Sequence, residues 1–173
     1  MLYLYRHGET EENRQHILQG LMPGTLSREG IEQIRQSIDH VLSLNIDLIL
    51  CSDIERCRQT ADILNTRLQL PIEYTPLLRE RDWGSATGMI VDGVTRIKLP
   101  DNVETIAQMQ QRASSFLDYV KTNYADKNVL AVSHGLFCRQ IQATYHKVQI
   151  ADIVRMSNCE IRKLDLNQYR TYT

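Results

Sequence analysis

The stretch Met1-Leu2-Tyr3-Leu4-Tyr5-Arg6-His7-Gly8-Glu9-Thr10 joins an apolar run to a cation, an imidazole and a glycine. The first five residues predict a short buried strand, and the glycine predicts a break soon after it. Ligands of open α/β sheets bind at the carboxyl ends of strands, where Arg6 and His7 would then lie. We therefore expect a reactive site at this strand end if other segments bring matching chemistry to the same edge.

Length and charge limit the classes of protein that need consideration. The chain has 173 residues and a formal net charge of −1. This length suits one hydrophobic core, so we expect a single domain over residues 1–173. The balanced charge gives no basis for binding nucleic acid or a membrane surface, and any anion must be recognised by locally placed basic residues. No apolar run approaches the roughly 20 residues that span a bilayer.

The cysteines point to a reducing compartment. Cys51, Cys57, Cys138 and Cys159 are scattered and form neither a CxxC pair nor a cluster with metal-ligand spacing. Two disulfides would be compatible with their number, but we expect buried, reduced thiols. We therefore expect a cytoplasmic protein, monomeric or homodimeric, without a nucleic-acid or membrane partner.

Hydrophobic periodicity predicts alternating strands and helices. Strands are expected at residues 1–5, 47–51, 72–75 and 129–132, and helices at 28–44, 52–68, 104–123 and 136–147. Ser27 is expected to cap the first helix, and Ser52, three residues before Glu55, the second. Residues 11–27 and 76–103 are expected to be irregular, and 155–166 and 169–173 to form an antiparallel pair. This order predicts an α/β three-layer sandwich: a mostly parallel central sheet, helices on both faces and an antiparallel edge near the C-terminus.

Three of these strands are followed by turns that carry charged, hydroxyl or imidazole side chains. Arg6-His7-Gly8 follows the first strand, Ser52-Asp53 with Arg56 follows the second, and Ser133-His134-Gly135 follows the strand at 129–132. Because the carboxyl ends of parallel strands share one edge, the histidines and arginines are expected to meet in one crevice. Helix starts at that edge add N–H donors and positive dipole ends. The sequence therefore predicts an anion site in which an imidazole acts on the anion.

Four motifs follow one another along the chain. The first is Arg6-His7-Gly8-Glu9-Thr10, followed by Asn13 and Gln19-Gly20, and the second is Ser52-Asp53-Ile54-Glu55-Arg56-Cys57-Arg58-Gln59-Thr60. The third is Leu78-Arg79-Glu80 with Gly84, and the fourth is Ser133-His134-Gly135. In type and order these motifs resemble those of the histidine phosphatase superfamily, also called phosphoglycerate mutase-like. The resemblance covers residues 6–135.

The resemblance implies a mechanism. His7 would be the nucleophile that forms a phosphohistidine, neutral at the attacking nitrogen while its other ring nitrogen donates elsewhere. Arg6, Arg56 and His134 would surround the phosphoryl oxygens, and a well-placed arginine contributes about 10³–10⁵ in rate. Glu80 would be the general acid and then the base that activates water, worth about 10²–10⁴. Because fixed donors can replace a metal here, we expect no metal and no cofactor.

Further residues are expected to contact the substrate. The family motifs assign phosphate or substrate contacts to Arg6, Asn13, Gln19, Gly20, Arg56, His134 and Gly135. The partner would be a small-molecule phosphate ester.

These residues also have purely structural interpretations. His7 could be a satisfied core histidine, Arg56 a solvated residue in a first helical turn, and His134 a cap of the next helix. Glu80 lies in the run Arg79-Glu80-Arg81-Asp82, which is typical of a solvated turn. The presence of all four motifs in order favours the functional interpretation of each.

The short interval between Gly84 and the helix expected from residue 104 bears on the reaction. Larger relatives place substrate-covering helices there, so we expect an open pocket with little lid. A mutase must keep water off its phosphohistidine, so we expect a phosphomonoester hydrolase acting on a small phosphorylated metabolite. The alternatives are a phosphoglycerate mutase, a phosphohistidine protein phosphatase, which commonly lacks an acid at the position of Glu80, and a non-catalytic phosphate-binding module.

Overall fold

The computed structural model describes residues 1–91 and 98–170, which contain a five-stranded sheet in the order β3-β2-β4-β1-β5. The strands are β1 (Leu2–Arg6), β2 (Leu48–Ser52), β3 (Ile72–Thr75), β4 (Val129–Ser133) and β5 (Ile161–Leu164). The pairs β2/β3, β2/β4 and β1/β4 are parallel, and β5 runs antiparallel to β1. The predicted α/β class, with its mostly parallel sheet and antiparallel edge, is confirmed.

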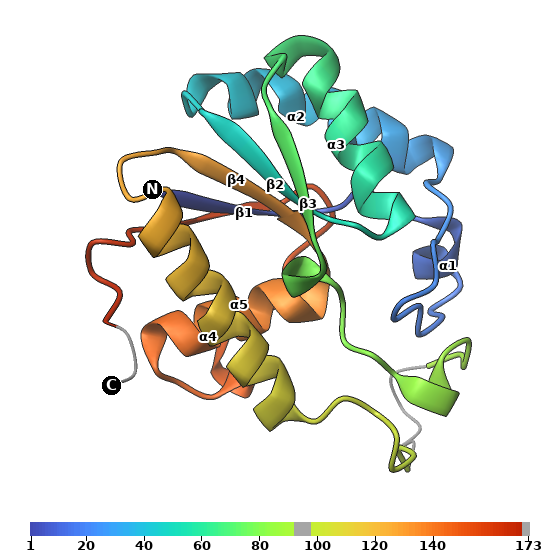
Figure 1. The fold of residues 1–173 in the computed structure, drawn as a ribbon. Coiled ribbons are helices and arrows are strands. Elements are labelled where there is room, and N and C mark those ends of the chain that lie inside the picture. The colour runs from blue at the N-terminus through green and yellow to red at the C-terminus, as the bar shows by residue number, and fades with distance from the viewer. Residues whose placement is uncertain (92–97, 171–173) are drawn as a thin grey trace.

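Helices cover both faces of this sheet (Figure 1). On one face lie α2 (Arg28–Ser43) and α3 (Glu55–Leu68), and on the other α4 (Ile106–Asn123) and α5 (Gly135–His146). The remaining helical elements are α1 (Glu11–Arg14) and the 3₁₀ turns Pro76–Leu78, Gly84–Ala86 and Ile150–Asp152. The layers predicted from the sequence are therefore present.

The strand side chains alternate between two cores. Leu2 and Leu4 of β1 pack toward the α4/α5 layer, whereas Tyr3 and Tyr5 pack toward the α2/α3 layer. Strands β2 and β4 alternate in the same way, because successive side chains of a strand point to opposite faces. Burial on both faces explains why these strands are continuous apolar runs.

Two helix starts show how the local sequence acts. Ser27 caps α2 as predicted, since its hydroxyl accepts a hydrogen bond from the Gly30 amide at 2.9 Å. The predicted cap at Ser52 is wrong: this residue ends β2, and α3 begins at Glu55 after Ile54. The Ser52 hydroxyl instead lies 2.9 Å from His134 Nε2, so the residue serves the sheet edge rather than the helix.

Two other expectations also need correction. Residues 11–27 were expected to be irregular but contain α1, which Thr10 caps through a capping box with Asn13. The C-terminal antiparallel partner of β5 is β1, not the segment 169–173. Residues 169–170 form no strand, and 171–173 lie outside the described residues.

Two further features concern membrane-spanning helices and the state of the cysteines. No helix in the two described ranges is long and apolar enough to cross a membrane. All four cysteines are free thiols: Cys51, Cys57 and Cys138 are buried, and Cys159 is half-buried.

Candidate active site

The parallel register aligns the carboxyl ends of three strands. Arg6 at the end of β1 pairs with Ser133 at the end of β4, and Cys51 of β2 pairs with Val132. The residues that follow these strands therefore meet at one edge, as predicted. The rings of His7 and His134 approach edge-to-face, with centroids 5.3 Å apart and an interplanar angle of 66°.

His7 is held as a neutral imidazole with one nitrogen available to the pocket. Its Nδ1 lies 2.7 Å from the Gly8 carbonyl oxygen, which can only accept, so Nδ1 carries the proton. Its Nε2 accepts a hydrogen bond from Arg56 Nε at 3.2 Å and therefore keeps its lone pair. Burial, and then the charges of Arg56 and Arg6, lower the pKa of His7 well below its ordinary value. This is the protonation state that a nucleophilic imidazole requires.

Arg56 is fully buried and links the site to the loop after α1. Its guanidinium donates to the carbonyl oxygens of Met22 and Gly20, at 2.5 and 2.9 Å, besides its bond to His7. No carboxylate within the described ranges forms an ion pair with it. Burial lowers its pKa, and its charge is positioned for an anion that the protein itself does not supply.

Arg6 lies beside the start of α5. Its Nη1 donates to the Met156 carbonyl oxygen at 2.5 Å, while its buried Nε has no hydrogen-bond partner among the described residues. A Cβ at Gly135 would lie 3.0 Å from that Nε, so glycine lets the helix start approach the guanidinium. An unsatisfied buried donor next to a helix N-terminus suits a phosphoryl oxygen.

Glu80 lies at the N-terminus of α5. Its carboxylate accepts hydrogen bonds from the backbone amides of Leu136 and Phe137, at 3.3 and 3.1 Å, and from Arg81 at 2.9 Å. The carboxylate is therefore fixed beside the same helix start as Arg6. The charge run around Glu80 is not simply a solvated turn.

A pocket of about 390 Å³ joins most of the predicted residues. Those that line it are Arg6, His7, Asn13, Gln19, Gly20, Arg56, Glu80 and Gly135. His134 does not line the pocket: it is fully buried behind His7, with Cys57 Sγ 3.4 Å and Ser52 Oγ 2.9 Å from its Nε2. Burial, and then the charge of Arg56, lower the pKa of His134 well below its ordinary value. His134 forms no side-chain cap on α5.

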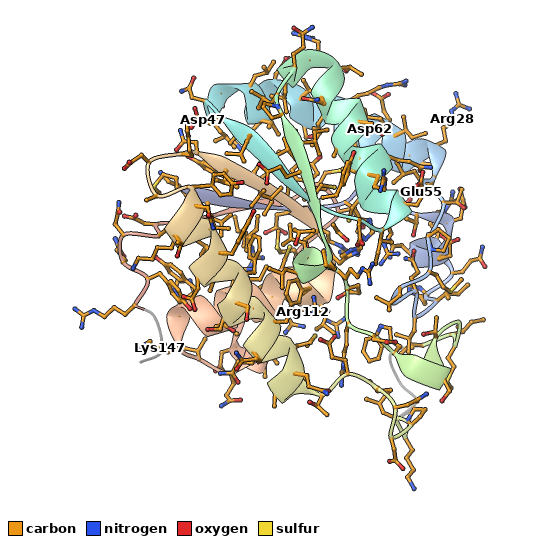
Figure 2. All side chains as sticks on the ribbon, viewed as in Figure 1. Arg28, Asp47, Glu55, Asp62, Arg112 and Lys147 are labelled. Atoms are coloured by element: carbon orange, nitrogen blue, oxygen red, sulfur yellow. The ribbon has the colours of Figure 1, made fainter. Side chains whose placement is uncertain are left out.

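Arg112 on α4 is a residue of the site that sequence reasoning missed (Figure 2). It donates to the carbonyl oxygens of Leu77, Arg79 and Glu80, at 3.1, 2.6 and 3.4 Å. It also donates to both carboxylate oxygens of Glu104, at 3.0 and 2.8 Å. Arg112 thus anchors the backbone that carries Glu80. The sequence feature that could have indicated this role is a cation on the apolar face of the helix, next to the buried Ala113.

Two more arginines at the pocket were also missed. Arg139 of α5 and Arg155 line it, together with apolar side chains of Ile17, Leu18, Trp83, Leu136 and Met156. Neither belongs to a family motif, and only the tertiary fold brings residues 139 and 155 to the same opening. The predicted openness of the pocket concerns the interval between Gly84 and residue 104, of which residues 92–97 lie outside the described residues.

The described residues offer no evident metal centre. Within residues 1–91 and 98–170 no group of three or more histidine, cysteine, aspartate or glutamate side chains is arranged to hold a metal ion.

Comparison with known proteins identifies relatives over nearly the whole chain. The profile of the histidine phosphatase superfamily, branch 1, matches residues 2–172. The chain is 37% identical over 136 residues to PhoE of Bacillus subtilis, described as an uncharacterized phosphatase, covering 76% of this chain and 70% of that protein. It is 30% identical to a probable phosphatase of Schizosaccharomyces pombe, covering 98% of this chain and 88% of the other. The crystal structure of the alpha-ribazole phosphatase from Shigella flexneri superposes with a TM-score of 0.80 at 25% identity, covering 92% of this chain and 87% of that one.

Proposed function

Since the chain belongs to the histidine phosphatase superfamily, we propose that it hydrolyses a small phosphorylated metabolite through a covalent phosphohistidine at His7. The observation that carries this proposal is the state of His7: a buried, neutral imidazole whose Nε2 lone pair faces a pocket flanked by two arginines. The proposed reaction class agrees with the relatives named as phosphatases.

In the first step, the phosphate of the ester occupies the inner end of the pocket. The Nε–H groups of Arg6 and Arg56 bind its oxygens, and Arg56 exchanges its bond to His7 for one to phosphate. His7 Nε2 attacks phosphorus, the N–P bond forms and the bond from phosphorus to the ester oxygen breaks. Glu80 takes up a proton from solvent as the negatively charged phosphate binds beside it, and it then gives this proton to the leaving oxygen, so the alcohol departs neutral. The Gly8 carbonyl stabilises the charge that develops on the ring through Nδ1–H.

In the second step, water attacks the phosphohistidine. Glu80, now ionised, takes a proton from the water as its oxygen bonds to phosphorus. The N–P bond breaks, inorganic phosphate leaves, and His7 returns to its neutral form. His134 lies behind His7 and supports the imidazole by packing rather than by lining the pocket. Asn13 and Gln19 line the pocket wall as polar substrate contacts.

The test is hydrolysis of p-nitrophenyl phosphate in excess EDTA, comparing the wild type with His7→Ala. We expect metal-independent turnover by the wild type and none by the variant. An inactive wild type between about pH 5 and 8 would favour a phosphate-binding module instead. Interconversion of 2- and 3-phosphoglycerate faster than phosphate release would favour a mutase.

The surroundings in which this enzyme acts are part of the proposal. The free thiols suit a reducing cytoplasm. A small-molecule phosphate ester suits a pocket of about 390 Å³, which lies in the usual range for small ligands. We propose a cytoplasmic monomer or homodimer, which sedimentation and cell fractionation would test.

A further inference from the structure

The pocket carries two positive charges that hydrolysis at His7 does not use. Arg139, which is half-buried, and Arg155, which is exposed, line the same pocket as the apolar side chains of Leu136, Met156 and Trp83. None of the ion pairs within the described ranges involves either arginine. Two cations at a pocket opening without a carboxylate partner indicate an anion that comes from outside the protein.

Arg139 is fixed in place before any ligand binds. Its Nε donates to the Ile153 carbonyl oxygen at 2.9 Å, and its Nη2 donates to that of Ile150, also at 2.9 Å. No hydrogen bond within the described ranges uses its Nη1, which leaves donors on that nitrogen for a ligand. A guanidinium that is already oriented loses little entropy when it binds a planar or tetrahedral anion.

Arg155 is exposed, but its backbone is tied to the inner site. Its carbonyl oxygen accepts from Arg162 Nη2 at 3.2 Å, and the next residue, Met156, accepts from Arg6 Nη1. The segment that carries Arg155 is therefore bonded to the arginine that faces the transferring phosphate. Burial, and then the charges of Arg155 and Arg162, lower the pKa of Arg139, because these cations repel one another.

We propose that Arg139 and Arg155 form a second anion subsite, so that the preferred substrates are small phosphomonoesters with a second anionic group, a carboxylate or another phosphate. This inference rests on the proposed function for the inner end of the pocket and specifies the substrate class. The apolar side chains that line the same pocket accommodate the carbon chain that joins the two anions. One charge-assisted hydrogen bond at such a site changes affinity by about tenfold or more.

The experiment measures binding without turnover. Alkylphosphonates of matched chain length, ending in a methyl, a carboxylate or a second phosphonate group, are titrated into the protein by calorimetry. The wild type should bind at least one class of doubly anionic ligand more tightly than the methyl-terminated ligand. This preference should fall about tenfold in Arg155→Gln and weaken with added salt. The carboxylate and phosphonate arms identify the second anion.

Arg28→Gln is the matched control, because Arg28, on α2 (Figure 2), is not among the residues that line the pocket, and the charge change is the same. The preference of Arg28→Gln for the doubly anionic ligand over the methyl-terminated ligand should equal that of the wild type. No preference at any chain length, or an equal preference in wild type and Arg155→Gln, would overturn the subsite. Hydrolysis of p-nitrophenyl phosphate is measured separately: its absence refutes the proposed function, whereas the phosphonate titration still decides the subsite.

Discussion

Replacing Arg112 tests how the proposed acid Glu80 is held. The Arg112 guanidinium bridges three backbone carbonyls of the segment 77–80 and the carboxylate of Glu104. The ion-paired side chains of Arg112 and Glu104 are only 18% and 15% exposed. The change to methionine keeps an unbranched apolar stem, shorter than that of arginine, and removes every one of these hydrogen bonds.

The structure sets the expected loss of stability. Removing one partner of a buried ion pair costs about 3–5 kcal/mol. The remaining exposure, and the bond that Glu104 keeps to the Asp82 amide, place Arg112→Met at about 3 kcal/mol. For a chain of this size that lowers the Tm by about 6–12 °C. The double variant Glu104→Gln/Arg112→Met should recover part of this loss, because no unpaired buried charge remains.

The expected loss of activity depends on the leaving group. An alkyl leaving group needs a proton from Glu80, whereas p-nitrophenolate leaves without one. Since proton transfer is worth about 10²–10⁴, a displaced acid should lower kcat/KM for an alkyl phosphate about 10- to 100-fold. The value for p-nitrophenyl phosphate should change little, because kcat/KM reports phosphoryl transfer to His7.

Steady-state assays well below the Tm of the variant measure both esters. Glu80→Gln should show the same dependence on the leaving group, to a larger extent, and Arg112→Lys an intermediate one. An equal loss with both esters would show that Arg112 supports only the fold, and unchanged stability would refute the strength assigned to its ion pair.

Two further predictions concern stability. The pKa values of buried His7 and His134 lie well below 6.5, so below that pH the unfolded chain binds more protons than the folded protein. The free energy of unfolding is therefore largest above pH 6.5. It falls by about 1.4 kcal/mol per pH unit for each histidine as the pH drops. Urea unfolding from about pH 7 to 5 should show a shallower slope for His134→Gln than for wild type, and equal slopes would contradict a buried neutral imidazole. A Cβ at Gly30 of α2 would lie 2.1 Å from the Glu9 carbonyl oxygen, so Gly30→Ala should destabilise by about 1–3 kcal/mol. Alanine normally stabilises a helix relative to glycine by about 1 kcal/mol, and a gain in urea resistance would refute the predicted clash.

The sheet could be predicted because its inner strands carry a strong local signal. Residues 1–5, 47–51 and 129–132 are apolar runs that overlap β1, β2 and β4, since parallel strands are buried on both faces. The edge strand β5 was predicted in place, but its pairing with β1 was not, because pairing depends on contacts distant in sequence. Ser52 was given a capping role from its spacing alone, and its contact with His134 could not be seen from the sequence.

The residues of the site likewise fall into those that could be predicted from local sequence and those placed by tertiary packing. Arg6 ends β1, and His7, Arg56 and Gly135 come soon after strand ends; parallel topology brings strand ends together whatever the details of packing. No topological rule of this kind places Arg112, Arg139 and Arg155. Arg112 reaches the segment that carries Glu80, and the other two reach the pocket, only through the packing of α4, α5 and the chain after α5. The placement of His134 behind His7, rather than in the pocket wall, likewise depends on side-chain packing.

The central claim is that His7 carries the phosphoryl group during turnover, and trapping that intermediate tests it most directly. Rapid quenching with a ³²P-labelled phosphomonoester should leave label on the wild type that is stable in alkali and lost in acid, as expected of an N–P bond. His7→Ala, shown by circular dichroism to be folded, should carry none. Label on the His7→Ala protein, or label on the wild type that survives acid, would contradict the account.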